Sequence, residues 1–144
     1  MARRAAGGST GRSQGAVAVL ADDLIWGSRL VAAVERAGAV PVSLRDAGEL
    51  ATALDADEAA ELAPDDERRL LGVVVDLGGR RYDGVDAVGR AAAARKPVIA
   101  VAQHEDTELR KRALSAGALR VFSYGKFFTD GPRLVDSWLV TAAV

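Results

Sequence analysis

Short runs of continuous apolar residues recur along the chain from residue 16 onward. Runs without polar alternation are typical of strands that are buried on both faces of a parallel sheet. The run that ends in Asp76, with three consecutive valines, gives the strongest signal among them. We predict strands at Ala16–Ala21, Val40–Leu44, Gly72–Leu77, Pro97–Ala102 and Leu119–Tyr124.

Between these runs, apolar residues recur at the spacing of amphipathic helices. In the first such segment Leu30 and Val34 share one face, and Gly38 supplies a stop. The last helix is expected to begin with Asp130 as its N-cap and Pro132 near its first position, where proline is tolerated. We predict helices at Leu24–Ala37, from Asp46 into the acidic segment Asp55–Arg69, at Asp83–Lys96, at Asp106–Ala116 and from Asp130 onward. The later part of the acidic segment is expected to be a solvated loop.

The alternation of strands and helices predicts an α/β protein with helices on both faces of a parallel sheet. The chain has 144 residues, the size of one domain. Right-handed crossovers favour a single flavodoxin-like α/β/α domain with strand order 2-1-3-4-5. Residues 1–15 are rich in Gly, Ser and Arg and show no apolar period, so we expect a disordered tail before a domain at residues 16–144.

Composition excludes several classes of protein. The formal net charge is −1, with no basic excess to favour nucleic acid, and the absence of cysteine removes disulfides and thiolate sites. No apolar run is long enough to span a membrane, and the basic amino terminus lacks the apolar segment of a secretory signal. We therefore expect a soluble cytoplasmic protein that binds neither nucleic acid nor membrane.

Three aspartates are expected to meet at one edge of the predicted sheet. Asp22 and Asp23 follow the first strand, and Asp76 lies near the end of the third, which is its neighbour in the predicted order. Like charges this close raise one another's pKa, and a hard divalent cation removes the conflict. We predict a Mg²⁺ site made by the three carboxylates and the Gly78 carbonyl, with Asp76 as a nucleophile toward a phosphoryl group.

The sequence resembles the receiver domains of bacterial response regulators over residues 16–139. The resemblance rests on VLADDL, which holds Asp22 and Asp23, on VVVDL, which ends with Asp76 and Leu77, on PVIAV and on the AGA before the last strand. It implies that the acidic pair binds Mg²⁺ and that Asp76 accepts phosphate.

The chain departs from that family at several positions. Ala102 stands where receivers carry Thr or Ser, and Tyr124 stands where they carry Lys, followed by Gly125 in place of Pro. Lys126 comes two residues later and reaches the site as a phosphate contact only if the loop is rearranged. Val121 occupies the position of the aromatic switch residue.

Three functional hypotheses follow. The first is a stand-alone receiver-like module of a phosphorelay that is not an enzyme. Such a module is expected to bind a histidine kinase or another signalling protein. It is also expected to form a homodimer through its fourth helix, fifth strand and fifth helix. The second is a pseudo-receiver, a non-catalytic interaction domain. The third is a phosphohydrolase-type enzyme, disfavoured because Gly78 stands where such enzymes place a second acid.

Simpler roles exist for most of these residues. Asp22 or Asp23 can cap the first helix, and His104 is most simply an exposed loop residue. The GGRR stretch at residues 78–81 is either a phosphate-binding turn or only a turn. Trp26 is expected to be partly exposed and to mark a partner contact.

Overall fold

The computed structural model describes residues 15–60 and 69–142. Its elements are β1 (Ala16–Leu20), α1 (Leu24–Arg36), β2 (Val40–Leu44), α2 (Ala47–Ala60), β3 (Leu70–Asp76), α3 (Gly84–Ala93), β4 (Val98–Ala102), α4 (Thr107–Ala116), β5 (Arg120–Ser123) and α5 (Tyr124–Ala142). The strands are parallel and lie in the order β2-β1-β3-β4-β5. The predicted flavodoxin-like fold and strand order are confirmed.

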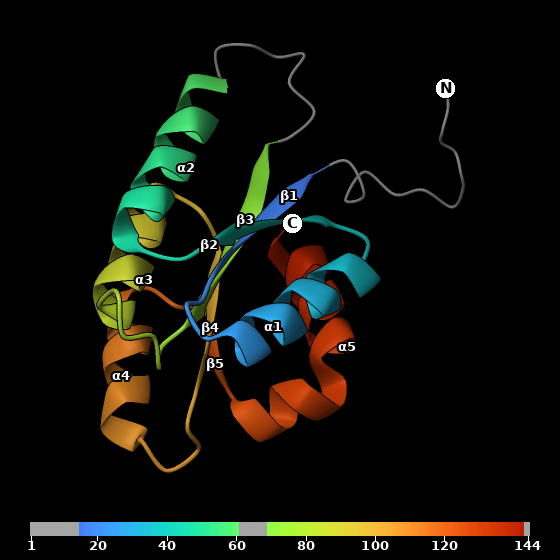
Figure 1. Ribbon diagram of the computed structural model, residues 1–144, viewed down its shortest axis with the longest axis vertical. Helices are drawn as coiled ribbons and strands as arrows, with labels where there is room; N and C mark the ends of the chain where they lie inside the picture. Colours follow the sequence, from blue (N-terminus) through green and yellow to red (C-terminus); the bar gives the residue numbers. More distant parts are fainter. Residues whose placement is uncertain (1–14, 61–68, 143–144) are drawn as a thin grey trace.

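Two hydrophobic layers hold the sheet between the helices (Figure 1). Side chains on one face of the sheet, among them Val73 and Val75, form a cluster beneath α2, α3 and α4. Val74 points to the opposite face and packs in a second cluster with residues of α1 and α5. Successive strand residues alternate between faces, so the central strands need apolar residues at every position.

Aspartates cap the starts of four helices, and before α2 the carboxylate of Asp46 accepts from the Glu49 amide at 2.8 Å. The carboxylate of Asp23 accepts from the Trp26 amide at 2.8 Å, and Asp83 and Asp106 make the equivalent bonds for α3 and α4. Gly38 after α1 and Gly117 after α4 have positive φ, a conformation that glycine adopts without strain. The predicted bounds of these helices are therefore close to the observed ones.

The fifth helix corrects the prediction. It begins at Tyr124, directly after β5, and Asp130 lies inside it rather than capping it. The Ser123 hydroxyl accepts from the Lys126 amide as a cap does. Pro132 is also inside the helix, where it cannot donate to the carbonyl four residues earlier, and α5 changes direction along its length (Figure 1).

The acidic segment continues α2 as far as Ala60, as predicted. The loop expected after it, and residues 1–14 of the tail expected at residues 1–15, lie outside the described residues. Gly15 itself is described, and its carbonyl accepts from the Val40 amide at 3.0 Å. Within the described ranges, no helix is both long and apolar enough to cross a membrane.

Candidate functional site

Asp76 is the last residue of β3 and is almost fully buried, with 2% of its surface exposed. A buried carboxylate needs hydrogen-bond donors, and Oδ1 of Asp76 has two. The Gly78 amide donates to it at 2.9 Å, and the hydroxyl of Tyr124 donates to the same oxygen. Asp76 is thus bound by neutral donors within its own chain.

Tyr124 reaches Asp76 from the first residue of α5, which follows β5 without a loop. Its ring packs on Trp26 of α1, with the ring centroids 4.6 Å apart. A side chain at Gly78 would put a Cβ only 2.5 Å from the Tyr124 hydroxyl oxygen. The hydroxyl therefore occupies space that exists because residue 78 is glycine.

Asp22 binds the loop that follows β3. Its Oδ2 accepts from the backbone amides of Arg80 and Arg81 at 2.8 and 2.6 Å. Consecutive amides that converge on one oxygen form an anion-binding concavity. In this structure the amides of the GGRR turn bind a group of the chain itself, the carboxylate of Asp22.

Asp23 caps α1 with its Oδ1, so its simpler role is confirmed. Its charge and that of Asp22 still act on the buried site. Burial raises the pKa of Asp76, the donors Tyr124 and Gly78 lower it, the charges of Asp23 and Asp22 raise it again, and the net direction is upward. The structure therefore places the three aspartates at one edge of the sheet, where they couple electrostatically.

The phenol of Tyr124 stays a donor throughout the physiological range. Burial raises its pKa, and so does the hydrogen bond to Asp76, because an ionised phenol beside a carboxylate is unfavourable. The bond therefore joins a protonated phenol to a carboxyl group.

Tyr82, which the sequence did not single out, closes the inner side of the site. Its buried hydroxyl lies 2.6 Å from the carbonyl oxygen of Asp76 and 3.1 Å from that of Leu20, so it bridges the ends of β3 and β1. A tyrosine six residues after Asp76 gave no sequence signal, because only the folded loop brings it back to the strands.

The remaining sequence-predicted residues lie away from Asp76 or offer it nothing polar. The ammonium of Lys126 pairs with Asp130 at 2.9 Å, one helical turn along α5, and is half exposed. Ala102 is buried at the end of β4 and presents a methyl group, and His104 is an exposed loop residue. The structure does not bring Lys126 to Asp76.

The residues proposed for Mg²⁺ are tied to other partners in this arrangement. Asp22 is bound to two amides, Asp23 to the start of α1, and Asp76 to Tyr124 and Gly78. In the described part of the chain, no group of three acidic, histidine or cysteine side chains is placed to hold a metal ion. Each of these carboxylates has a second oxygen that accepts none of these bonds, but the three side chains are not grouped around one ion position.

No protein-family model matches the chain, and no curated protein sequence does. A probable two-component response regulator/GGDEF domain protein matches with a TM-score of 0.72 and 18% identity, over 92% of this chain and 52% of that one. A response regulator receiver domain from Rhodospirillum rubrum matches with a TM-score of 0.66 and 18% identity, over 87% and 94%. The BeF3-activated DrrB receiver domain matches with a TM-score of 0.63 and 17% identity, over 86% of this chain and 96% of that one.

The chain therefore has the fold of response-regulator receiver domains. Its likeness to these structures is one of shape, since the identities are low. A shared fold does not determine activity, which depends on the residues at the site itself.

Proposed function

We propose that this chain is a pseudo-receiver, a signalling module that acts through protein contacts while Asp76 stays bound to Tyr124. The observation that carries the proposal is the hydrogen bond from the Tyr124 hydroxyl to the Asp76 carboxylate. A phosphoryl donor must reach a carboxylate oxygen in line, but Asp76 is buried and Tyr124 packs against Trp26 over it.

The surroundings of Asp76 support the same conclusion. Phosphoryl transfer depends on cations and hydrogen-bond donors placed around the phosphoryl oxygens. Ala102 offers no donor, and Lys126 has its own partner in Asp130. Neither of the groups that stabilise a phosphoryl oxygen in receivers is in place here.

The fold supports a signalling protein as the partner of this chain. The proteins that share it are described as two-component response regulators and receiver domains. We infer a cytoplasmic role in two-component signalling, with a histidine kinase or another signalling protein as partner and no catalytic turnover by this chain.

A second candidate is a receiver that accepts phosphate on Asp76, with Mg²⁺ on Asp22, Asp23, Asp76 and the Gly78 carbonyl. It is favoured by the electrostatic coupling of the three aspartates. It requires the Tyr124 hydroxyl to leave Asp76, and the metal would use the oxygens of Asp22 and Asp23 other than those that bind the amides of Arg80, Arg81 and Trp26.

Beryllium fluoride, a phosphoryl mimic that activates the structurally similar DrrB, separates the two candidates. We would add it with Mg²⁺ and follow tryptophan fluorescence, because Trp26 packs on Tyr124 and reports any movement there. The wild type and Asp76→Asn should both be unresponsive. A change in wild type that Asp76→Asn lacks would favour the phosphoacceptor.

A further inference from the structure

The edge of the sheet at which the strands begin, opposite Asp76, holds a cavity of its own. This cavity has a volume of about 320 Å³ and lies between the start of β3, the residues that lead into β4 and the end of α5. Its walls are mostly apolar and include Leu71, Pro97 and Leu139, and Arg95 and Lys96 complete the lining. An apolar cavity of this size with a few polar groups is typical of a small-molecule site.

Arg95 ends α3 in a conformation that glycine usually adopts. Its φ is +66°, and within the described ranges it is the only residue other than glycine with a positive φ. The amides of Arg95 and Lys96 donate to carbonyls in the last turn of α3, which is the Schellman pattern of a helix end. Gly38 and Gly117 close α1 and α4 with the same pair of bonds. The turn itself therefore needs no side chain, and a side chain there costs conformational energy.

The chain compensates the charge of Lys96 but not that of Arg95. The Lys96 ammonium pairs with Asp57 and donates to the Leu70 carbonyl at 3.3 Å. Arg95 is exposed, and within the described residues its side chain makes no ion pair or hydrogen bond. Glu58 lines a neighbouring cavity together with Arg95 but does not come within ion-pair distance of it. Since no described acidic residue lines the apolar cavity, it has one uncompensated positive charge beside it.

The core beside the apolar wall contains an unused hydrogen-bond donor. Trp138 precedes Leu139 and packs in the same hydrophobic cluster as Leu71, and a Cβ on Gly72 would lie 2.5 Å from its ring. The Nε1 of Trp138 is buried and has no acceptor among the described residues. Buried donors are seldom left unpaired, so this part of the core suits a polar atom of a ligand or a water molecule.

We propose that this cavity, which the proposed signalling function does not use, binds a monocarboxylic acid with an apolar chain of medium length. The guanidinium of Arg95 suits a carboxylate, because its N–H groups can donate two parallel bonds to the two oxygens. The chain of the acid would lie against Leu71, Pro97 and Leu139, where burial of its methylene groups adds to the affinity. Because Asp57 neutralises Lys96, one negative charge matches the cavity better than two. A ligand of this kind explains an arginine where α1 and α4 have glycine.

A titration with sodium octanoate, followed on the full chain by two-dimensional NMR, tests the site. The amide signals of Leu71, Leu139 and Ala142 should shift with a dissociation constant on the order of 1 mM. Octanamide keeps the chain but lacks the charge, and it should bind about tenfold more weakly. Acetate keeps the charge but lacks the chain, and it should cause no localised shift. The proposal would be overturned if octanoate gave no localised shift up to about 10 mM, or if octanamide bound equally well.

Substitution of Arg95 separates binding of the acid from a purely structural role. Arg95→Gln should weaken octanoate binding about tenfold, whereas Arg112→Gln, at an exposed arginine of α4, should leave it unchanged. Arg95→Gly removes the guanidinium and the unfavourable φ together. It should therefore lose binding to the same extent as Arg95→Gln, yet unfold at no lower a urea concentration than the wild type. Unchanged octanoate binding by either Arg95 variant would overturn the proposal and leave this arginine a structural role only.

Discussion

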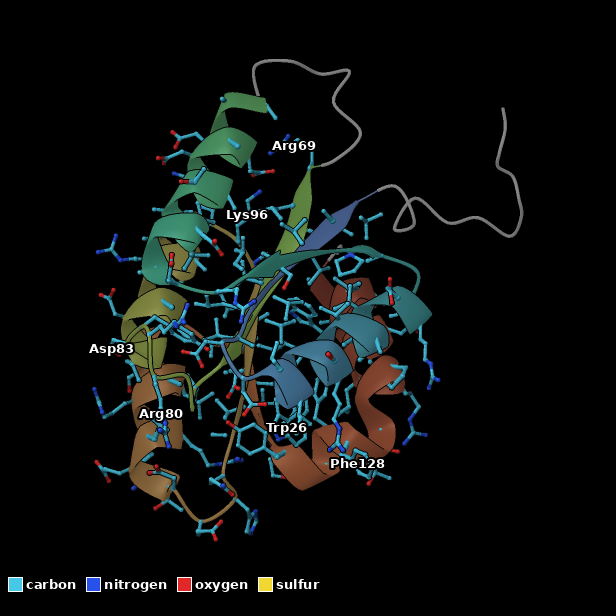
Figure 2. The ribbon with its side chains drawn as sticks, viewed as in Figure 1. Trp26, Arg69, Arg80, Asp83, Lys96 and Phe128 are labelled. Carbon is cyan, nitrogen blue, oxygen red and sulfur yellow. The ribbon has the colours of Figure 1, made fainter. Side chains whose placement is uncertain are left out.

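In the described part of the chain only two ionisable acidic or basic side chains (Asp, Glu, His, Lys or Arg) are buried, and both are aspartates at opposite ends of the sheet. Asp57 of α2 accepts a 2.7 Å bond from the Leu70 amide, pairs with Arg69 at 3.0 Å and also pairs with Lys96. Asp76 has only neutral donors and two further aspartates nearby. Figure 2 shows Arg69 and Lys96 beside the start of β3, away from Trp26.

The partners decide what burial does to each carboxyl group. Burial alone raises the pKa of Asp57, but the hydrogen bonds and charges of Arg69 and Lys96 overcome it and hold the pKa at about 2. At Asp76 no cation opposes burial, and the pKa is raised. Ionised Asp57 therefore stabilises the fold, whereas ionised Asp76 destabilises it. Such a cost is typical of a functional site.

The largest expected effect is the loss of Asp57. Asp57→Ala leaves Lys96, which is mostly buried, without its carboxylate and the Leu70 amide without an acceptor. We expect the free energy of unfolding in urea to fall by about 3–5 kcal/mol. Asp86→Ala is the control, because it removes an exposed ion pair with Arg90 and should change the stability far less. Equal losses in the two variants would contradict the structural role of Asp57.

Acidification should separate the two aspartates by the sign of their effect on stability. Asp57 has a lowered pKa, so its contribution is present above pH 3.8 and is lost as the pH falls toward about 2; this loss is about 2 kcal/mol. Asp76 has a raised pKa, so the cost of its charge is relieved as the pH falls through that pKa toward 3.8. Urea unfolding at a series of pH values measures both slopes. The Asp76→Asn variant should keep the slope that comes from Asp57 and lack the slope that comes from Asp76.

Removing the charge at Asp76 should stabilise the fold at neutral pH. Asp76→Asn keeps an oxygen to accept from Gly78 and Tyr124 but ends the unfavourable interaction with Asp22 and Asp23. We expect a gain on the order of 1 kcal/mol. Asp83→Asn alters an exposed cap and should give no gain. A less stable Asp76→Asn protein would mean that the carboxylate is better paired than we describe.

The smallest expected effect comes from Tyr124→Phe. It removes one hydroxyl and leaves the ring against Trp26, so it should cost about 1 kcal/mol or less. The tryptophan emission spectrum should stay close to that of the wild type, since the ring of residue 124 still packs on Trp26. A large loss of stability, or unfolding of the site reported by Trp26, would show that the hydroxyl bond rather than the aromatic pair holds this end together.

The fold was predictable because apolar strands and capped helices are local signals. The acidic cluster was also predictable, since Asp22, Asp23 and Asp76 end neighbouring strands. The bond between Tyr124 and Asp76 was not, although the resemblance placed Tyr124 at the position that carries lysine in receivers. It depends on α5 starting directly after Ser123 and on the space left at Gly78, and neither is encoded in a residue's own propensity.

The start of α5 was missed for a related reason. Asp130 and Pro132 together suggest a helix start, and this signal obscured a helical stripe that begins earlier. Phe127, Gly131 and Val135 are buried at helical spacing, on the same face as Trp138. Tertiary burial of that stripe outweighs the cost of a proline inside the helix.

Intact-mass measurement distinguishes an Asp76 that stays bound to Tyr124 from an Asp76 that takes phosphate. The full chain would be incubated with Mg²⁺ and a small acyl phosphate donor, beside Asp76→Asn. Our account expects both proteins to keep their unmodified mass. A wild-type mass increased by one phosphoryl group, and absent from Asp76→Asn, would contradict it and make Asp76 a working phosphoacceptor.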